Sequence, residues 1–422
     1  MFSEFDRLAM TRALALAERG LETTHPNPRV GCVIAKGDRI IAEGWHERAG
    51  EAHAEVAAIR AAKEPVAGAT AYVTLEPCSH YGRTPPCVNA LIEARIARVV
   101  FAVQDPNPRV SGQGAGTLLR AGITVEAGLL QAEATELNIG FMKRMREGLP
   151  WVRVKLAMSL DGRTALANGA SQWITSEAAR ADVQRWRARC SAVMTGVGTM
   201  LADDPQLNVR VAGFKGRQPL RVVLDAQLRS SLGAKMFVGL GETAAARDGG
   251  PDGAAANGGT GLASGVRPGS ASGVGSSATG IAPDVPGSMP GGVLIFAAVD
   301  GGTSAAPATF QTRRAALLAR GVRIEEVAAD DGFLDLFAVL KKLGELDVNE
   351  VLVEAGPTLA GQLLTKSLVD ELLLYIAPKL LGPQGRPLVN LPELQSLQEA
   401  LGFALFDAKQ LGDDLRLRLR PK

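Results

Sequence analysis

Apolar runs and helical periods alternate along the first third of the chain. Residues 30–35 and 40–44 are apolar on either side of Lys36-Gly37-Asp38, which predicts a β-hairpin. Residues 69–75 and 98–103 are rich in β-branched residues and suit buried strands. Helices are predicted over 1–20, 51–62, 90–97 and 131–146. This alternation predicts an α/β/α sandwich around one sheet.

A second set of elements begins after Glu147-Gly148-Leu149-Pro150, which we interpret as a domain boundary. Ser176 is placed to cap a helix over 176–189, with Glu177 in its first turn. Further strands and helices are predicted over 151–157, 192–195, 220–224, 293–299, 322–327, 333–343, 351–354, 358–368 and 371–377, and 401–419 is expected to close the sheet. We therefore predict two α/β domains, 1–147 and 151–422.

Residues 239–292 differ from everything around them. They are rich in Gly, Ala, Ser and Pro and contain almost no aromatic side chains. Such a segment cannot bury enough apolar surface to offset the entropy lost on ordering. We expect a disordered insertion within the second domain.

The composition of the 422 residues is ordinary for a soluble protein, with 46% hydrophobic and 21% charged residues. The net charge of +2 and the 5% aromatic content argue against a nucleic-acid partner, which would favour a basic groove and stacking platforms. Residues 1–20 are charged throughout, and no apolar run approaches the ~20 residues that span a bilayer. We expect a cytoplasmic protein without a membrane partner; a homo-oligomer remains open.

Three of the four cysteines and all four histidines lie in the first ninety residues: Cys32, Cys78, Cys87, His25, His46, His53 and His80. Four cysteines in so long a chain do not form a disulfide scaffold. Thiols and imidazoles confined to one part of a chain indicate metal chemistry there instead.

The order His53-Ala54-Glu55, Pro77-Cys78 and Pro86-Cys87 predicts a zinc deaminase site. One imidazole and two thiolates would hold zinc and leave a fourth position for water, whose pKa the metal lowers towards ~7. Glu55 would move a proton from that water to the ring nitrogen and then to the departing ammonia. Helix starts near Glu51 and Pro86 would favour thiolate.

Two alternatives remain open at this point. The cysteines could be buried and metal-free, or the zinc could be structural, with His80 as the fourth ligand. The two cysteines flank eight residues, where the usual spacing is two. Residues 79–86 are therefore a candidate substrate loop.

Several motifs in this part of the chain form a set: His25-Pro26-Asn27-Pro28-Arg29-Val30-Gly31, His53-Ala54-Glu55, Glu76-Pro77-Cys78-Ser79-His80, Gly82-Arg83-Thr84-Pro85-Pro86-Cys87 and Asp105-Pro106-Asn107-Pro108. This set resembles the family of bifunctional riboflavin-biosynthesis deaminase–reductases, whose cysteine spacing it shares. The resemblance implies a cytidine-deaminase-like domain that deaminates 2,5-diamino-6-(5-phosphoribosylamino)pyrimidin-4-one. It further implies that Asn27, His46, His80 and Arg83 hold this phosphoribosylated pyrimidine. Read without the resemblance, Asn27 could fix a turn, His46 could be an ordinary strand-end histidine, and Arg83 could be solvated.

The second domain lacks the dinucleotide fingerprint G-x-G-x-x-G, because 196–201 fails at its third glycine. Two other glycine turns, 195–199 and 354–361, each follow an apolar strand and could present backbone N–H groups to phosphate. Either turn alone is more often a simple connection.

The same resemblance continues through the second half, over 155–163, 171–175, 201–205 and 354–361. It implies a dihydrofolate-reductase-like domain that uses NADPH to reduce the ribosyl group of 5-amino-6-(5-phosphoribosylamino)uracil to ribityl. The implied cofactor contacts are Ala157, Trp173, Thr199, Asp203, Gly356, Pro357, Thr358, Leu359, Ala360, Gly361 and Gln362. The implied substrate contacts are Ser171, Arg187, Leu207, Arg210 and Glu354, with Lys155 and Asp161 near the chemistry.

Plainer interpretations exist here too. Trp173 could belong to the core, and Arg187 could lie on a solvated face with Arg185 and Arg189. The resemblance implies a cofactor-binding hydroxyl at the position of Ala226, so this chain departs from the family's pattern there. The competing functions are a nucleic-acid deaminase with an unrelated C-terminal partner and a zinc-stabilised ligand-binding protein. A zinc-stabilised ligand-binding protein would have no evident use for Glu55 beside a site with three metal ligands.

Overall fold

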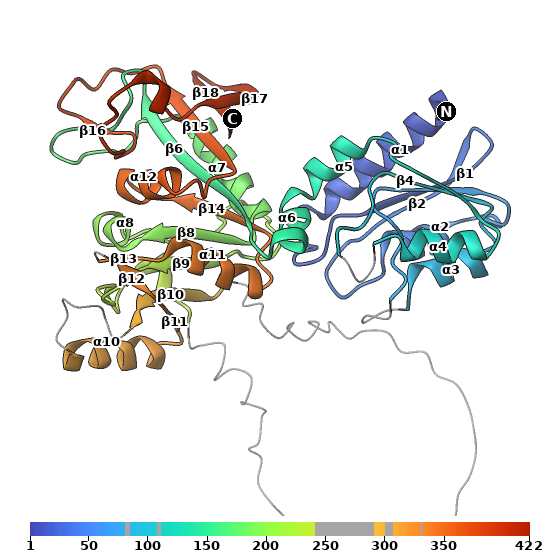
Figure 1. Cartoon of the computed structure of the whole chain (residues 1–422), viewed down its shortest axis with the longest axis horizontal. Helices are drawn as coiled ribbons and strands as arrows, with labels where there is room; N and C mark the ends of the chain where they lie inside the picture. The colour runs from blue at the N-terminus through green and yellow to red at the C-terminus, as the bar shows by residue number, and fades with distance from the viewer. Residues whose placement is uncertain (81–84, 108–110, 241–290, 300–306, 331) are drawn as a thin grey trace, which may run out of the picture.

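The computed structural model describes residues 1–80, 85–107, 111–240, 291–299, 307–330 and 332–422 (Figure 1). The predicted insertion at 239–292 therefore lies outside the described residues except at its two ends. Arg83 also lies outside them.

The first sheet has five strands in the order β2-β1-β3-β4-β5. The predicted hairpin is confirmed as β1 (Gly31–Lys36) paired antiparallel with β2 (Arg39–Trp45). β1 also pairs antiparallel with β3, while β3, β4 and β5 run parallel. Their bounds are β3 (Thr70–Val73), β4 (Arg98–Phe101) and β5 (Thr124–Ala127).

Helices cover both faces of this sheet, as predicted for an α/β/α sandwich (Figure 1). One apolar cluster joins it to α1 (Glu4–Ala17), α5 (Gln131–Leu137) and α6 (Ile139–Glu147). The other joins it to α2 (Ala54–Ala61), α3 (Cys87–Glu93) and α4 (Gln113–Arg120). The single helix predicted over 131–146 is divided at Asn138, because the buried amide of this residue bonds the backbone of Arg29.

The second sheet has nine strands in the order β11-β10-β9-β8-β14-β6-β15-β18-β17. The seven from β11 to β15 run parallel, and the last two are antiparallel. Their bounds are β6 (Trp151–Ser159), β8 (Ala192–Gly196), β9 (Leu220–Leu224), β10 (Val293–Ala298), β11 (Arg323–Val327), β14 (Glu350–Glu354), β15 (Glu371–Ala377), β17 (Phe403–Leu411) and β18 (Asp414–Pro421). The strands predicted at the C-terminus form one edge of this sheet.

Two layers of helices bury the second sheet. One apolar cluster contains residues of α11 (Leu336–Glu345) and α12 (Pro357–Thr365), and the other contains residues of α7 (Glu177–Arg189), α8 (Val197–Asp203) and α10 (Pro307–Ala319). Ser176 caps α7 as predicted, because its hydroxyl accepts from the N–H of Ala179. Two small ladders, β7 (Arg163–Ala165) with β16 (Arg386–Pro387) and β12 (Ala329–Asp330) with β13 (Phe333–Leu334), complete the described strands.

The two halves meet through buried charged groups. Arg153 has no exposed surface and bonds Glu350 at 3.0 Å and Glu371 at 2.8 Å. Burial alone would raise the pKa of Glu371, but Arg153 and Arg418 hold it at about 2. Arg29, from the first half, bonds the other carboxylate oxygen of Glu350 at 2.7 Å. Arg29 therefore joins the first half to a buried charge network of the second half, in which each carboxylate has arginine partners. Across the described part of the chain, every helix falls short of the length and apolar content that spanning a membrane requires.

Candidate active sites

The three predicted zinc ligands come together where two helices begin. His53 is the N-cap of α2, Cys87 is the first residue of α3, and Cys78 lies between β3 and α3. Their ligand atoms all lie within 4.8 Å of one another. His53 Nδ1 is 3.2 Å from Cys87 Sγ and 3.5 Å from Cys78 Sγ. Zinc at roughly 2.0 Å from nitrogen and 2.3 Å from sulfur separates such ligands by about 3.5 Å, so the set fits tetrahedral zinc.

The group has three members and not four. Among the residues that the structure describes, no further His, Cys, Asp or Glu joins it, and His80 is exposed. The alternative of a sealed zinc site with His80 as fourth ligand is therefore not supported by this geometry. Hydrogen bonding by Cys87, and then by His53, lowers the pKa of Cys78 to about 4, against the cost of burial. This shift favours the thiolate form of Cys78, which zinc binding requires.

Glu55 is buried in the first turn of α2, two residues after His53. Burial, and then the charge of Cys78, raise the pKa of its carboxyl, while His53 partly opposes this. A raised pKa makes a carboxyl a better proton acceptor, as a group that carries protons between water and substrate requires. The position suits a proton carrier beside the metal.

Asn27 and His46 lie beside this group. His46 follows β2, is buried, and its ring centroid is 5.3 Å from that of His53. Its Nδ1 donates to the carbonyl of Ala52 at 3.0 Å, which leaves Nε2 to accept from the amide of Asn27 at 3.1 Å. Burial lowers the pKa of His46, in accord with this neutral form. The structure thus brings two of the predicted substrate residues to the zinc ligands.

Glu76 and Asp105 are buried residues whose positions we did not assign from sequence. The Glu76 carboxylate accepts backbone N–H groups of Asp105, Gly112 and Ala115, at 3.3, 3.0 and 3.1 Å. Burial raises the pKa of Asp105 to about 6. The sequence signal for Glu76 as a buried acceptor of backbone N–H groups is a charged residue at the end of an apolar strand, directly before Pro77-Cys78. Glu76 thus holds Asp105 after β4 and the start of α4.

In the second half, the two candidate glycine turns meet. The N–H of Gly356, the N-cap of α12, donates to Thr199 Oγ1 at 3.2 Å. No side chain of the described residues caps α12, and a Cβ added at Gly198 would meet no described atom within 4 Å. Pro357 has no N–H and that of Gly356 is bonded, so residues 358 and 359 are the candidate donors of this helix start to a phosphate group, and hence to a dinucleotide.

The predicted cofactor residues have different surroundings. Leu359 and Ala360 belong to the core, so only their backbone is available to a ligand. Trp173 is 63% exposed and lies against the guanidinium of Arg180 at 4.5 Å, so its interpretation as a core residue is wrong. Asp203 ends α8 and is exposed, and Ala157 lies in β6. Ala226 packs against the core after β9.

Arg187 and Glu354 form a buried pair. Arg187 Nε and Nη2 bond the two Glu354 oxygens at 2.5 and 2.9 Å, and Nη1 bonds the carbonyl of Asn208 at 3.0 Å. Arg187 is 7% exposed, so its interpretation as a solvated residue is wrong. Lys155 pairs with Glu354 in the register of β6 and β14, and burial lowers its pKa. This charge cluster lies at the carboxyl ends of parallel strands, where ligands bind in open α/β sheets.

The other residues predicted to contact or lie near the substrate are not part of the Arg187–Glu354 pair. Leu207 is buried in the apolar cluster with α7, and Arg210 is exposed beside Asn208. Asp161 accepts from Ser159 and from the N–H groups of residues 381 and 382, so it holds a loop. Ser171 lies in the segment between β7 and α7.

Comparison with known proteins finds relatives over the whole chain. Residues 3–103 match the family model of the cytidine and deoxycytidylate deaminase zinc-binding region, and residues 150–247 and 301–417 match that of the RibD C-terminal domain. Riboflavin biosynthesis protein RibD of Escherichia coli is 44% identical over 98% of this chain and 99% of its own, and that of Haemophilus influenzae is 41% identical over 100% and 99%. The solved structure of Acinetobacter baumannii RibD, form 1, has a TM-score of 0.80, with 40% identity over 99% of both chains. A Thermotoga maritima diaminohydroxyphosphoribosylaminopyrimidine deaminase/5-amino-6-(5-phosphoribosylamino)uracil reductase has a TM-score of 0.75, with 29% identity over 99% of both chains.

A first domain that matches the deaminase zinc-binding region and holds a group of three candidate ligands, with a second domain that matches the RibD C-terminal domain, defines a deaminase joined in one chain to a reductase. Both family matches and the full-length relatives agree with this architecture, including the predicted cytidine-deaminase-like first domain. The chain belongs to the family of riboflavin biosynthesis proteins RibD, which are bifunctional deaminase–reductases.

Proposed function

We propose that the chain catalyses two consecutive steps on one phosphorylated pyrimidine. The first is hydrolytic deamination of 2,5-diamino-6-(5-phosphoribosylamino)pyrimidin-4-one, and the second is NADPH-dependent reduction of the ribosyl group of 5-amino-6-(5-phosphoribosylamino)uracil to ribityl. The observation that carries the first step is the three-membered ligand group with the buried Glu55 beside it. Family membership connects the two steps.

In the deaminase site, His53, Cys78 and Cys87 hold zinc. When bound, zinc supplies the Lewis acidity that makes water reactive at neutral pH. Glu55 carries the two protons of the attacking water in turn, one to the ring nitrogen and the other to the amino group that leaves as ammonia. Asn27 and His46, which bond each other beside the ligands, orient the pyrimidine. His80 and Arg83 are assigned to the phosphoribosyl group by the resemblance.

In the reductase site, NADPH lies along the turns that meet at Thr199 and Gly356. When bound, this cofactor supplies the hydride. The chain contributes backbone N–H groups at the start of α12 and the side chains around them, and the set comprises Ala157, Trp173, Thr199, Asp203, Gly356, Pro357, Thr358, Leu359, Ala360, Gly361 and Gln362. The substrate set is Ser171, Arg187, Leu207, Arg210 and Glu354. Open space at Gly198 and the uncapped helix start support this placement.

A cytoplasmic location agrees with the cysteine chemistry. All four cysteines are free, and two of them are zinc ligands in this proposal. Thiolate ligands persist where thiols are kept reduced.

The test separates the two activities. The protein is incubated with the diaminopyrimidine phosphate, and ammonia release and NADPH oxidation are measured independently. Glu55→Gln, which keeps the shape of the side chain and removes its charge, should lower ammonia release at least 100-fold while zinc content stays at one per chain. Oxidation of NADPH by the same variant, given the deaminated intermediate, should match the unmodified protein. Unaltered ammonia release, or loss of zinc from Glu55→Gln, would refute the role of Glu55.

A further inference from the structure

The loop of residues 23–29, here called the docked loop, carries Asn27 and contacts both domains. Towards the deaminase site, the Asn27 amide bonds His46 Nε2 at 3.1 Å, and its backbone N–H donates to Thr24 at 2.8 Å. Away from that site, the same loop is bonded to residues of the reductase domain. The two sets of contacts are made by neighbouring residues of the chain, Pro26 and Asn27.

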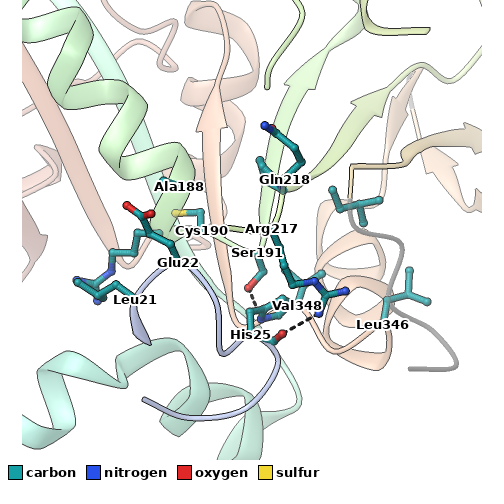
Figure 2. Close-up of a pocket in the computed structure, with 13 residues that line it drawn as sticks. Leu21, Glu22, His25, Ala188, Cys190, Ser191, Arg217, Gln218, Leu346 and Val348 are labelled. Atoms are coloured by element: carbon teal, nitrogen blue, oxygen red, sulfur yellow. Dashed lines mark hydrogen bonds between the residues drawn. The ribbon is translucent and has the colours of Figure 1, made fainter. Parts of the chain in front are cut away.

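The first contact to the reductase domain is made by His25. Its Nδ1 is 2.9 Å from Ser191 Oγ (Figure 2). The same oxygen accepts the N–H of Asn349 at 3.1 Å, so the hydroxyl hydrogen is free to be donated to His25. Burial, and then the charge of Arg217, lower the pKa of His25 to about 3, so the ring is neutral and can accept. Arg217 also donates to the His25 carbonyl at 2.8 Å.

The second contact is made next to Asn27 itself. The amide of Asn349 donates to the carbonyl of Pro26 at 2.9 Å. The oxygen of that amide accepts from Arg144 Nε at 2.6 Å, which sets the orientation of the amide. Asn349 is buried and directly precedes β14. The carbonyl that precedes Asn27 is therefore held by a side chain of the other domain.

The third contact lies just beyond Asn27. Arg29 bonds Glu350 Oε1 at 2.7 Å and the carbonyl of residue 189 at 3.1 Å, both in the reductase domain. Its backbone N–H and carbonyl are bonded by Asn138 at 2.8 Å each. Asn27 thus lies between two anchor points that the reductase domain supplies.

The pocket beside this contact is too small to be a second substrate site. It is lined by His25, Ser191 and Arg217 among others (Figure 2) and has a volume of about 30 Å³. That volume admits a water molecule but no pyrimidine. The polar groups around it therefore act on the loop and not on a ligand.

We propose that Asn349 is a positioning residue of the deaminase site, supplied by the reductase domain. Through Pro26 it holds Asn27 at the distance from His46 at which both orient the pyrimidine. The inference rests on the role proposed above for Asn27. It follows that deamination depends on the docked reductase domain even though the metal ligands and Glu55 all belong to the other domain. A misplacement of about 1 Å in such a group is enough to lower a rate many-fold.

The test uses the full-length zinc-loaded protein. Asn349→Ala should lower kcat/KM for ammonia release roughly tenfold, mainly through KM, because a substrate contact is misplaced while the zinc ligands and Glu55 are not. Reduction of the deaminated intermediate should stay within twofold. Asn27→Ala should lower deamination at least as much, and Asn27→Ala combined with Asn349→Ala should lower it no further, because the second change acts through the first.

Two further variants separate positioning from general damage. Lys143→Met removes a different ion pair between the domains, with Asp370 at 2.6 Å, and should leave deamination within twofold. Arg217→Met removes the bond to the His25 carbonyl and should reproduce the selective effect in weaker form, which serves if Asn349→Ala does not fold. Normal deamination by both Asn349→Ala and Arg217→Met, with Asn27→Ala impaired, would overturn the inference and leave the site intact. Equal loss in both reactions, additive losses in the double variant, or a matching loss in Lys143→Met would overturn it too. If Asn27→Ala itself has no effect, the proposed role of Asn27 fails instead.

Discussion

The buried pair of Arg187 and Glu354 allows a quantitative test of the reductase site. The side chains are 9% and 14% exposed and are joined by two short bonds. Burial raises the pKa of Glu354, and Arg187 is the largest of the charges that bring it below its usual range. Arg187→Met leaves that carboxylate buried with only the charges of Lys155 and Arg210 nearby. Breaking a buried pair in this way costs about 3–5 kcal/mol, and because Lys155 still compensates we expect about 3 kcal/mol.

The assay is thermal unfolding, followed by tryptophan fluorescence; three of the four tryptophans lie in the second domain, among them Trp186 next to Arg187 in α7. For a domain of this size, about 3 kcal/mol corresponds to a decrease in Tm of roughly 6–12 °C. Arg187→Met combined with Glu354→Gln should recover part of that loss, because no carboxylate is then buried without Arg187, while Lys155 loses its carboxylate neighbour. Reduction of the deaminated intermediate should stay low in both variants, while ammonia release is retained. A single variant within about 1 kcal/mol of the unmodified protein, or a double variant no more stable than the single one, would refute this reasoning.

Two more predictions concern the deaminase domain and its contact with the reductase domain. Below pH ~6.5 the unfolded chain protonates His25, whereas the folded chain resists protonation down to about pH 3, so stability should fall on acidification by up to about 1.4 kcal/mol per pH unit. Urea unfolding at pH 7 and pH 5 measures this, and the same slope in His25→Gln would exclude His25 as its source. A methyl group at Gly44 would overlap the N–H of Ala58 and lie 2.7 Å from the carbonyl of Ala54. Gly44→Ala should therefore displace α2 with His53, cost about 2–3 kcal/mol and lower both zinc content and deamination. Gly116→Ala, which meets only the flexible end of Arg120, is the matched control and should retain both.

Local features of the fold were predictable because they depend on neighbours in the chain. The alternation around Lys36-Gly37-Asp38 predicts β1 and β2, and the hydroxyl of Ser176 caps α7 as expected. Helix boundaries were less accurate. The helix expected over 90–97 begins at Cys87 and ends at Glu93, because Pro86 supplies its N-cap and Arg95 adopts a left-handed conformation.

The candidate metal site was predictable for a chemical reason. Few residue types bind zinc, so the order of His53, Cys78 and Cys87 narrows the possibilities before any fold is known. The residue types expected at the reductase site are not restricted in this way. Glycine turns and arginines are common, and only the family resemblance singled out Arg187 from its neighbours on α7.

The amino-acid order alone predicted most of the elements, the candidate metal ligands and Glu55 beside them, because each follows from short-range pattern or from scarce side-chain chemistry. Tertiary structure decided which distant groups meet. The strand order β8-β14-β6 brings Glu354 to Lys155 and lets Arg187 reach it, and packing of the two domains places Asn349 on Pro26. Such contacts join positions more than a hundred residues apart. They depend on how the strands are connected and on what becomes buried, and the local hydrophobic periodicity of the chain carries no information on either.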